Sequence, residues 1–439
     1  MTENRHLEIN EQGHMVIGGC DTTELAATYG TPLYVMDELS IRENIRMYRD
    51  AMTRHYEDQG MVLYASKAFC TTTICRIAHQ EGIGLDVVSG GEIHTALAAG
   101  FPMEKVWFHG NNKTAEELSL ALECGVGRIV VDNLQELALL DRLAAEHGRQ
   151  VEISVRVKPG VDAHTHEFIK TGSIDSKFGV ALENGEALLF AEKTLEMPHI
   201  TLMGIHCHIG SQIFDLAPFE LAAEVMLGFA AELRDRFGIQ IRELNLGGGF
   251  GIKYTESDDP VAYDQYIESV SNVVNRVCQE KGLARPFMIM EPGRSIVATA
   301  GITLYRIGNV KEIQDVRTYV AVDGGMFDNP RYALYQSKYT FRLANRMRAE
   351  NSQLVTVAGK CCESGDLLGK DVPLPEAKPG DLMAVLATGA YNYSMAMNYN
   401  RNVRPAIVLV RDGRHRVIVK RETYADLIRN DILPDDLHP

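Results

Sequence analysis

The sequence has no long hydrophobic run, and this absence narrows the functions open to it. No stretch of its 439 residues approaches the roughly 20 consecutive apolar residues that a membrane-spanning helix needs. The first residues, Met1 to Leu7, are polar and lack the apolar core of a secretory signal peptide. We therefore expect a cytoplasmic protein without a membrane-embedded segment.

The sequence also lacks an excess of positive charge. Its 44 Lys and Arg residues against 59 Asp and Glu residues give a formal net charge of −15, and no local stripe of basic residues stands out. A chain this acidic has no general electrostatic attraction for a phosphate backbone. A nucleic-acid partner is therefore not expected, although a local pocket for a small anion remains open.

The cysteine pattern gives no metal or disulfide framework. None of the eight cysteines forms a Cys-x-x-Cys pair, so their spacing predicts neither a structural zinc site nor a set of disulfides. Scattered thiols of a cytosolic protein account for most of them. The adjacent pair Cys361-Cys362 can be an ordinary buried pair or can include a functional thiol.

Short β-rich runs alternate with amphipathic helical stretches over about 230 residues, counted as eight βα units. Buried parallel strands read as short, nearly continuous apolar runs, so this pattern predicts a (β/α)8 TIM barrel. Asn133 and Thr114 fit helix N-caps within it. The predicted strands are Met61–Tyr64, Leu85–Val88, Val106–Phe108, Arg128–Val131, Glu152–Val157, Leu202–His206, Glu243–Leu246 and Phe287–Met290.

The pattern changes after about residue 295, where strand-like pieces follow one another with turn signals such as Asp412-Gly413 between them. We expect a C-terminal, mostly antiparallel β domain that the β-like N-terminal segment joins. The predicted ranges are 38–295 for the barrel, and 1–37 with 296–439 for a β-sandwich or β-barrel-like domain. The pieces lie at 302–307, 318–322, 353–357, 382–386, 406–410 and 416–419.

The chemistry of a (β/α)8 barrel lies at the carboxyl ends of its strands, which makes three segments candidates. Lys67 follows the first strand and is either a solvated surface residue or an amine that forms a covalent bond with a carbonyl. The glycine-rich loop 247–251 follows the seventh strand, and Glu291 ends the eighth. The loops after these two strands are the usual phosphate site of the fold.

The sixth strand runs into His206-Cys-His208-Ile-Gly-Ser211. Alternation puts the two histidines on the same side if the strand persists, but no third metal ligand accompanies them in the sequence, so we expect no metal. A ring stacked on a flat cofactor is a better use of one histidine, and Ser211 could donate to a phosphate. With a lysine, a phosphate cradle and a strand-end carboxylate, this describes a site for pyridoxal 5′-phosphate.

At this point the sequence resembles the barrel-type, alanine-racemase-like (fold type III) pyridoxal-phosphate decarboxylases, and among them it is most similar to the diaminopimelate decarboxylases. The resemblance implies decarboxylation of meso-2,6-diaminopimelate to L-lysine and CO2. Its motifs cover nearly the whole chain: 64–68, 84–92, 109–113, 159–166, 177–179, 206–212, 247–249, 291–294, 362–366 and 389–391.

The resemblance also implies roles for individual residues. Lys67 matches the lysine that holds the cofactor covalently, and Glu291 matches the partner of the pyridine nitrogen. His208 matches the imidazole on the ring face. The complete expected set of cofactor-binding residues is Lys67, Asp86, His208, Ser211, Gly248, Gly249, Glu291, Gly293, Arg294 and Tyr391.

On the substrate side, Cys362 matches the catalytic proton donor. The groups that match the binding site of the substrate's distal end are Arg294, Arg331, Tyr335, Glu363 and Tyr391. The family places Cys362 and Glu363 in the site of the neighbouring subunit, which implies a homodimer with shared active sites. Several positions depart from the family pattern on the substrate-side wall: Phe327, Tyr332, and Asn392-Tyr393.

Four alternatives remain open. Ornithine and arginine decarboxylases act on substrates that end in a cation, which Arg294 and Arg331 would repel. Carboxynorspermidine decarboxylase is a minor rival with a carboxylated substrate. An alanine-racemase-type enzyme would lack the distal binding residues, and a non-enzymatic carrier of the same cofactor would lack the C-terminal domain.

Overall fold

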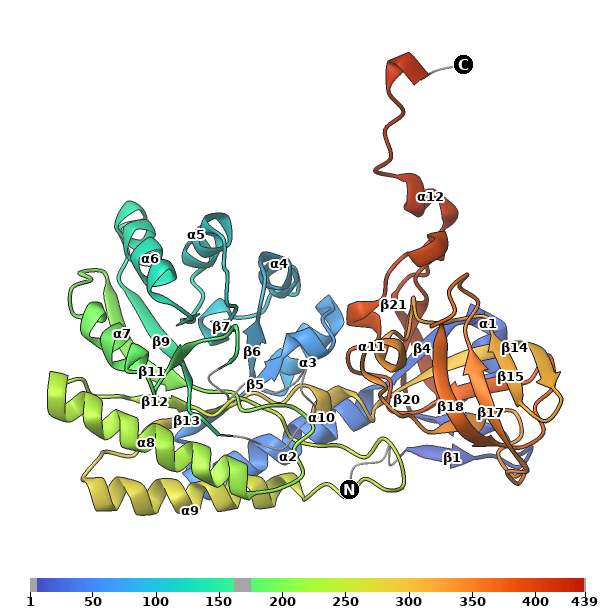
Figure 1. Cartoon of the computed structure of the whole chain (residues 1–439), viewed down its shortest axis with the longest axis horizontal. Coiled ribbons are helices and arrows are strands. Elements are labelled where there is room, and N and C mark those ends of the chain that lie inside the picture. Colours follow the sequence, from blue (N-terminus) through green and yellow to red (C-terminus); the bar gives the residue numbers. More distant parts are fainter. Residues whose placement is uncertain (1–5, 162–174, 438–439) are drawn as a thin grey trace. The chain divides into compact units, whose positions relative to one another are not determined.

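The computed structural model describes residues 6–161 and 175–437 and divides the chain into two compact units (Figure 1). Within those described residues, the first unit comprises 42–253 and 257–296. The second comprises 6–41, 254–256 and 297–437. The short excursion 254–256 therefore belongs with the second unit, although it lies between two barrel elements in the sequence.

The first unit is a closed parallel barrel, as predicted. Its strands pair in the order β9-β11-β12-β13-β5-β6-β7-β8, and a further pairing of β8 with β9 closes the ring. A two-residue strand, β10 (Val180–Ala181), pairs with β9 outside the ring. The barrel strands are β5 (Gly60–Ala65), β6 (Gly84–Val87), β7 (Val106–Phe108), β8 (Arg128–Val131), β9 (Val151–Lys158), β11 (Ile200–His206), β12 (Glu243–Asn245) and β13 (Phe287–Met290).

Helices lie around these strands (Figure 1). Both predicted N-caps are present: the side chain of Thr114 caps α5 in a capping box with Glu117, and Asn133 caps α6. The helices are α2 (Glu38–Tyr56), α3 (Thr72–Gln80), α4 (Gly90–Ala98), α5 (Ala115–Cys124), α6 (Leu134–Glu146), α7 (Glu186–Thr194), α8 (Ala217–Phe237), α9 (Tyr263–Lys281) and α10 (Arg294–Val297). Short 3-10 turns are η1 (Ser66–Ala68) and η2 (Met103–Lys105).

Ion pairs of a buried arginine join neighbouring strands at the amino-terminal end of the barrel. Arg128, at the start of β8, donates from two nitrogens to Glu243 of β12 at 2.6 and 2.9 Å. Its third contact is Glu152 at 2.7 Å. A bidentate pair of a buried arginine fixes this end, and leaves the carboxyl ends of the strands for function.

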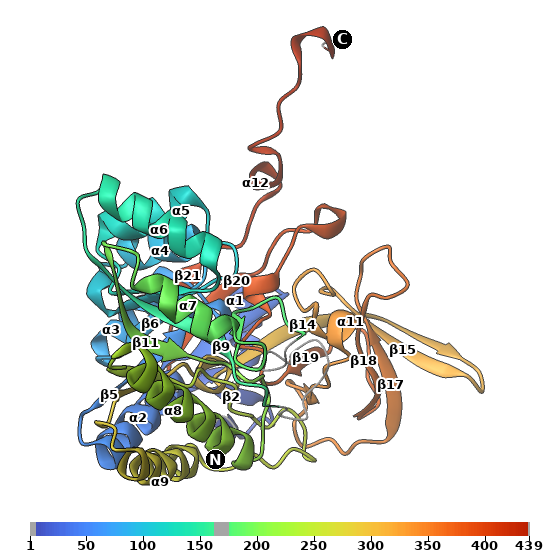
Figure 2. The ribbon, with the colours of Figure 1, turned by 60° about the vertical axis from the view of Figure 1, so that its left-hand side comes forward.

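The second unit is a mostly antiparallel sheet, also as predicted. Its strands run in the order β18-β17-β15-β14-β4-β20-β21, and β19 pairs with β14 and β16. The strands are β4 (Leu33–Asp37), β14 (Gly301–Ile313), β15 (Arg317–Val322), β16 (Phe341–Leu343), β17 (Gln353–Ala358), β18 (Leu367–Leu374), β19 (Leu382–Val385), β20 (Ala406–Arg411) and β21 (Arg414–Val419). Figure 2 shows the long antiparallel pair β14 and β15.

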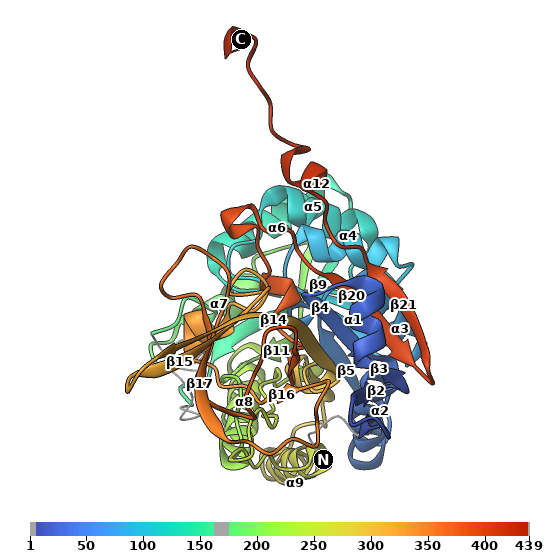
Figure 3. The same ribbon diagram turned by 90° about the vertical axis from the view of Figure 1, so that its right-hand side faces the viewer.

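The N-terminal segment joins this sheet through β4, which pairs antiparallel with β14 and parallel with β20 (Figure 3). A separate small sheet precedes it, formed by β1 (Leu7–Ile9), β2 (Met15–Ile17) and β3 (Cys20–Asp21). The helices of the second unit are α1 (Thr22–Tyr29), α11 (Arg331–Tyr335) and α12 (Tyr424–Ile428). Short 3-10 turns follow at η4 (Tyr393–Met395), η5 (Tyr399–Arg401) and η6 (Asp435–Leu437).

Strands β3, β10, β16 and β18, with helices α1, α11 and α12, had no counterpart among the predicted elements. The buried faces of β2, β4, β14 and β20 share one hydrophobic cluster, which includes Ile17, Val35, Leu304 and Val408. Among the described residues, no helix is both long enough and apolar enough to cross a membrane.

Candidate active site

Lys67 lies where β5 ends, on the short turn η1. Its Nζ forms an ion pair with Asp86 Oδ2 at 2.7 Å, and its side chain is 39% exposed while that of Asp86 is inaccessible. Asp86 belongs to the next strand, β6, which pairs with β5. The amine therefore stands at the carboxyl end of the barrel with a buried carboxylate beside it, accessible to a small molecule.

Glu291 directly follows β13, and its carboxylate contacts three polar side chains. Asn245, the last residue of β12, donates to its Oε1 at 2.6 Å. His206 Nε2 lies 3.2 Å from Oε2, and His109 Nε2 lies 2.8 Å from Oε1. The ends of three other strands thus converge on one buried carboxylate.

Burial and the contacts between these side chains together set the charge state of Glu291 and His206. Burial alone would raise the pKa of Glu291, but the attraction of His109 and His206 and their hydrogen bonds outweigh it and hold that pKa well below its usual value. Burial lowers the pKa of His206 to about 4. At neutral pH His206 is therefore neutral, and Glu291 is an ionised acceptor at the base of the site.

The two histidines of the 206–212 motif have different partners. Strand β11 ends at His206, so the alternation that would pair it with His208 does not continue. Instead, His208 Nδ1 accepts a hydrogen bond from the backbone N–H of Gly248 at 3.2 Å. Burial, followed by the nearby charges of Lys67 and Arg156, holds the pKa of His208 well below its usual value. The His208 ring is thus neutral and anchored to the glycine loop.

The glycine loop is packed too closely for side chains. A Cβ on Gly248 would lie 2.1 Å from the carbonyl oxygen of Glu291. One on Gly249, whose φ is +109°, would lie 2.4 Å from the carbonyl oxygen of Gly210. Asn245 Oδ1 accepts from the N–H of Gly247 at 2.9 Å, which ties the loop to the strand that precedes it.

Ser211 and Arg294 meet beside this loop, where Arg294 Nη2 donates to Ser211 Oγ at 3.0 Å. Arg294 begins α10, and its residue is largely buried. Gly293 precedes it, and a Cβ there would lie 2.9 Å from the Cβ of Ala65. A hydroxyl and a guanidinium are donors that suit a phosphate group.

These residues fit pyridoxal 5′-phosphate. The close-packed glycines Gly248 and Gly249 with Ser211 suit its phosphate, a neutral His208 ring suits its flat face, and an ionised Glu291 suits its pyridine nitrogen. Ligand atoms of His109, His206 and Glu291 lie within 4.8 Å of one another. Both histidines contact the carboxylate itself, His109 at 2.8 Å and His206 at 3.2 Å.

The predicted substrate residues Arg331, Tyr335 and Tyr391 come together in the second unit. The guanidinium of Arg331 lies 5.4 Å from the ring centre of Tyr335 and 5.5 Å from that of Tyr391. Arg331 is largely buried on α11, and none of the described Asp or Glu residues forms an ion pair with it. A buried guanidinium surrounded by neutral groups is suited to an incoming carboxylate.

Cys362 and Glu363 lie on an exposed turn of the second unit. Asp366 stabilises this turn, because its carboxylate accepts hydrogen bonds from the backbone N–H groups of Cys361 at 2.7 Å and Met326 at 2.6 Å. The N–H of Cys362 donates to Asn400 Oδ1 at 2.7 Å. The turn is therefore tied to the segment that leads to Arg331, while its thiol stays accessible.

The departures from the family pattern occupy different environments. Phe327 and Asn392 are buried, whereas Tyr332 is half-buried on α11. Tyr393 packs edge-on against Tyr34 with ring centres 6.0 Å apart. The side chain of Asn392 donates to the Tyr339 hydroxyl at 3.4 Å.

Sequence reasoning missed three residues of the barrel site. His109 and Asn245 stand at the ends of β7 and β12, where the rule used for Lys67 and Glu291 would have found them. Arg156 is buried within β9, with its guanidinium 4.2 Å from the ring centre of Phe178. Because Arg156 lies inside a strand and not at its end, the rule for strand ends did not select it. Residues 162–166 of the predicted 159–166 motif lie outside the described residues.

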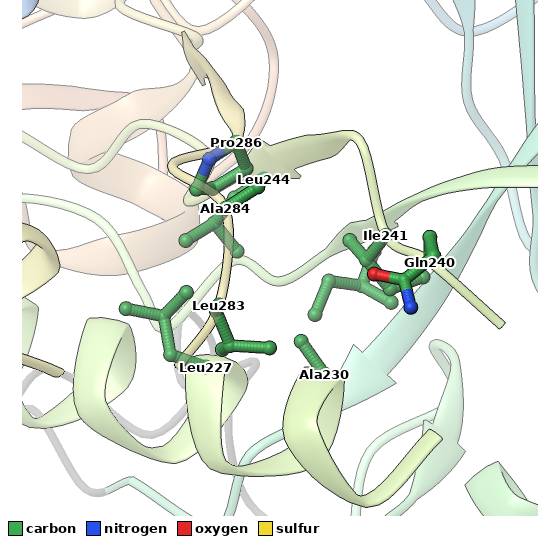
Figure 4. A pocket seen from close by; sticks show the side chains of 9 residues that line it. Leu227, Ala230, Gln240, Ile241, Leu244, Leu283, Ala284 and Pro286 are labelled. Carbon is green, nitrogen blue, oxygen red and sulfur yellow. The ribbon is translucent and has the colours of Figure 1, made fainter. Parts of the chain in front are cut away.

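A separate apolar pocket lies between α8 and the segments that precede β12 and β13 (Figure 4). Because those segments enter the barrel at its amino-terminal end, the pocket is not part of the site around Lys67. It is lined by Ile205, Leu227, Ala230, Gln240, Ile241, Leu244, Leu283, Ala284 and Pro286.

Comparison with known proteins is consistent with this geometry. Residues 39–298 match the family described as pyridoxal-dependent decarboxylase, pyridoxal binding domain. Over 423 residues the chain is 52% identical to the diaminopimelate decarboxylase of Bacillus subtilis, with 96% of each chain covered. The chain belongs to the diaminopimelate decarboxylase family. This confirms the predicted resemblance, the carboxy-lyase class and the cofactor, pyridoxal 5′-phosphate.

Other members of this family cover the same length. The diaminopimelate decarboxylase of Mycobacterium tuberculosis strain H37Rv is 42% identical over 438 residues, which cover 98% of this chain and 97% of that one. The crystal structure of diaminopimelate decarboxylase from M. jannaschii in complex with L-lysine is 38% identical. It superposes with a TM-score of 0.93 and covers 100% of both chains.

Proposed function

We propose that this chain decarboxylates meso-2,6-diaminopimelate to L-lysine and CO2 with pyridoxal 5′-phosphate, the last step of lysine biosynthesis by the diaminopimelate pathway. The observation that carries the proposal is the 52% identity to the B. subtilis enzyme over 96% of both chains. Arg331 supports it, because a buried guanidinium without an ion-pair partner among the described residues favours a substrate with a distal carboxylate. Ornithine and arginine offer no such carboxylate.

In this proposal the barrel holds the cofactor. Lys67 binds it covalently with Asp86 beside the amine, and His208 covers the ring. Glu291 stays ionised and keeps a proton on the pyridine nitrogen. When bound, the cofactor supplies an acceptor for the electron pair that remains when CO2 departs. The phosphate contacts come from Ser211, Gly248, Gly249, Gly293 and Arg294.

The second unit completes the reaction. Cys362 Sγ delivers a proton to the carbon that has lost CO2, which is why its accessible position on the turn matters. Glu363 binds the distal amine of the substrate, while Arg294 and Arg331 bind its distal carboxylate, and Tyr335 and Tyr391 shape the wall. We propose that the enzyme is a cytoplasmic homodimer in which Cys362 and Glu363 complete the neighbouring subunit's site.

A substrate panel tests the proposal. The holoenzyme is supplied with meso-, LL- and DD-diaminopimelate, ornithine, arginine and carboxynorspermidine, and CO2 release is measured. We expect release from meso-diaminopimelate at a rate well above all the others, with L-lysine as the product. Faster release from ornithine, arginine or carboxynorspermidine would reject the proposed substrate, and no release from any of them would reject the activity.

A further inference from the structure

Lys113 is a buried lysine that the proposed reaction does not use. It lies in the loop between β7 and α5, and its side chain is 1% exposed. Its Nζ donates to the carbonyl oxygens of Gly110 and Val130, at 2.8 Å each, and to Glu136 Oε1 at 2.6 Å. These contacts match the three donors of an ammonium group. Lys113 therefore joins the loop after β7 to strand β8 and helix α6.

The partner carboxylate, Glu136, is also fixed in place. It belongs to the first turn of α6, and its side chain is 4% exposed. Its backbone N–H donates to the N-cap oxygen, Asn133 Oδ1, at 2.9 Å, and its Oε2 accepts from the N–H of Asp132 at 3.3 Å. Removing one member of a buried pair leaves an uncompensated charge, so such a pair resists opening. The Lys113–Glu136 pair is therefore a firm attachment point for the loop.

The loop that this pair holds begins with His109. Gly110 directly follows His109, and its φ of +134° is a conformation that favours glycine. The N–H of His109 donates to the carbonyl oxygen of Val87, the last residue of β6, at 2.8 Å. The backbone is thus fixed on both sides of the His109 side chain, by β6 through the N–H of His109 and by Lys113 through the carbonyl of Gly110.

The His109 side chain faces two buried carboxylates. Its Nε2 lies 2.8 Å from Glu291 Oε1 and 3.8 Å from Asp86 Oδ1. Its ring meets that of His206 edge-on, with ring centres 4.8 Å apart. Burial opposes ionisation of Glu291, and the attraction of His109 is the largest of the effects that hold the pKa of Glu291 low. Because electrostatic attraction falls with distance, this effect depends on where the backbone places the His109 ring.

We propose that His109 is a positioning residue for Glu291 and that the Lys113–Glu136 pair holds His109 in place. The inference rests on the proposed function, in which Glu291 meets the pyridine nitrogen of the cofactor. His109 stabilises the ionised carboxylate from the end of β7, and Lys113 fixes the loop that begins with His109. All three residues then act on the cofactor through Glu291.

Two ligands of the wild-type and variant apoenzymes separate this role from a general structural one. Pyridoxal 5′-phosphate has the pyridine nitrogen, whereas its carbocyclic analogue has a C–H group there and keeps the aldehyde and the phosphate. Both Kd values are measured by calorimetric titration, and the nitrogen ratio is defined as the Kd of the cofactor divided by that of the analogue. His109→Phe keeps an aromatic ring but removes the contact with Glu291. The loss of one contact to a charged group predicts a rise of about tenfold in the nitrogen ratio.

The double variant Lys113→Met/Glu136→Gln tests the attachment, because it removes both charges of the pair and leaves neither unpaired. We expect the nitrogen ratio to rise by about threefold, since His109 is displaced but still present. If the pair acts through His109, adding this double variant to His109→Phe raises the nitrogen ratio no further. Lys193→Met/Glu196→Gln is the matched control, because it removes an exposed lysine–glutamate pair at the end of α7. It should keep the wild-type ratio.

The result that overturns the inference is a wild-type nitrogen ratio in His109→Phe, whether both Kd values stay unchanged or both rise by the same factor. A wild-type ratio in Lys113→Met/Glu136→Gln, or a further rise when it is added to His109→Phe, would overturn the role of the pair. Glu291→Gln is the reference that separates this failure from a failure of the proposed function. A ratio unchanged in Glu291→Gln rejects the proposed pairing with the pyridine nitrogen, whereas a ratio raised in Glu291→Gln but not in His109→Phe rejects the role of His109 alone.

Discussion

Gly248→Ala tests the glycine loop as the phosphate site. The added Cβ would lie 2.1 Å from the carbonyl oxygen of Glu291, where ordinary contact begins at 3.4 Å. The loop must therefore move by about 1.3 Å, the difference between these two distances. Since a misplacement of about 1 Å can cost about a hundredfold in a positioned site, we expect the Kd for pyridoxal 5′-phosphate to rise by about that factor.

The assay is titration of apoenzyme with pyridoxal 5′-phosphate, followed by the absorbance of the bound cofactor. Gly228→Ala is the control, because a Cβ at that position in α8 meets nothing within 4 Å. A helix gains about 1 kcal/mol from this change, so the control should bind the cofactor normally and resist heat slightly better. Unchanged cofactor affinity in Gly248→Ala would refute the placement of the phosphate.

The remaining predictions concern charge, covalency and the dimer. Lys67→Ala should retain no cofactor after borohydride reduction, as read by mass spectrometry; a retained cofactor mass would exclude Lys67 as the covalent site. Glu291→Gln should keep the cofactor but lose kcat, because the amide cannot hold the proton on the ring nitrogen; wild-type kcat would contradict the pairing. Burial raises the pKa of Asp328 to about 7. The stability it contributes is therefore fully present below about pH 4 and is lost as the pH rises to about 7, a linkage of about 4 kcal/mol. Asp328→Asn should make the thermal midpoint less dependent on pH between about 4 and 7, and an unchanged profile would contradict this. Hybrids of Cys362→Ala and Lys67→Ala subunits should recover about a quarter of wild-type activity, because half of the randomly mixed dimers regain one intact site. Hybrids confirmed by mass spectrometry but inactive would place Cys362 in its own subunit's site or outside the chemistry.

The fold could be predicted because its signals are local. The barrel strands are recognisable in the sequence as short apolar runs, and three of them, Val106–Phe108, Arg128–Val131 and Phe287–Met290, have the predicted bounds. Thr114 and Asn133 cap the helices that their side chains indicated. Strands such as β18 (Leu367–Leu374) were missed, because its Gly-Lys-Asp centre and its proline are poor strand formers that tertiary pairing with β17 overrides.

The site could be predicted only in part, because its geometry depends on residues far apart in the sequence. The end-of-strand rule found Lys67 and Glu291, but it could not tell which groups contact Glu291. Asn245 and His109 acquire their role only when β12 and β7 close into the same ring. The pairing of Tyr339 with Asn392 has no local signature, since 53 residues separate them.

The proposed cofactor site and the proposed substrate site each contain a buried charge, Glu291 in the first and Arg331 in the second, and the protein treats the two charges differently. A buried charge is costly unless it is paired or hydrogen-bonded. The carboxylate of Glu291 is stabilised by contacts from Asn245 and two histidines of the protein, so it is ionised before the cofactor binds. At Arg331 the described residues offer neutral acceptors and aromatic rings and no carboxylate within ion-pair distance. The guanidinium there gains a full charge partner only from a ligand, so affinity at that end depends on whether the ligand carries a carboxylate. Discrimination against ornithine and arginine then follows from the missing charge and needs no steric exclusion.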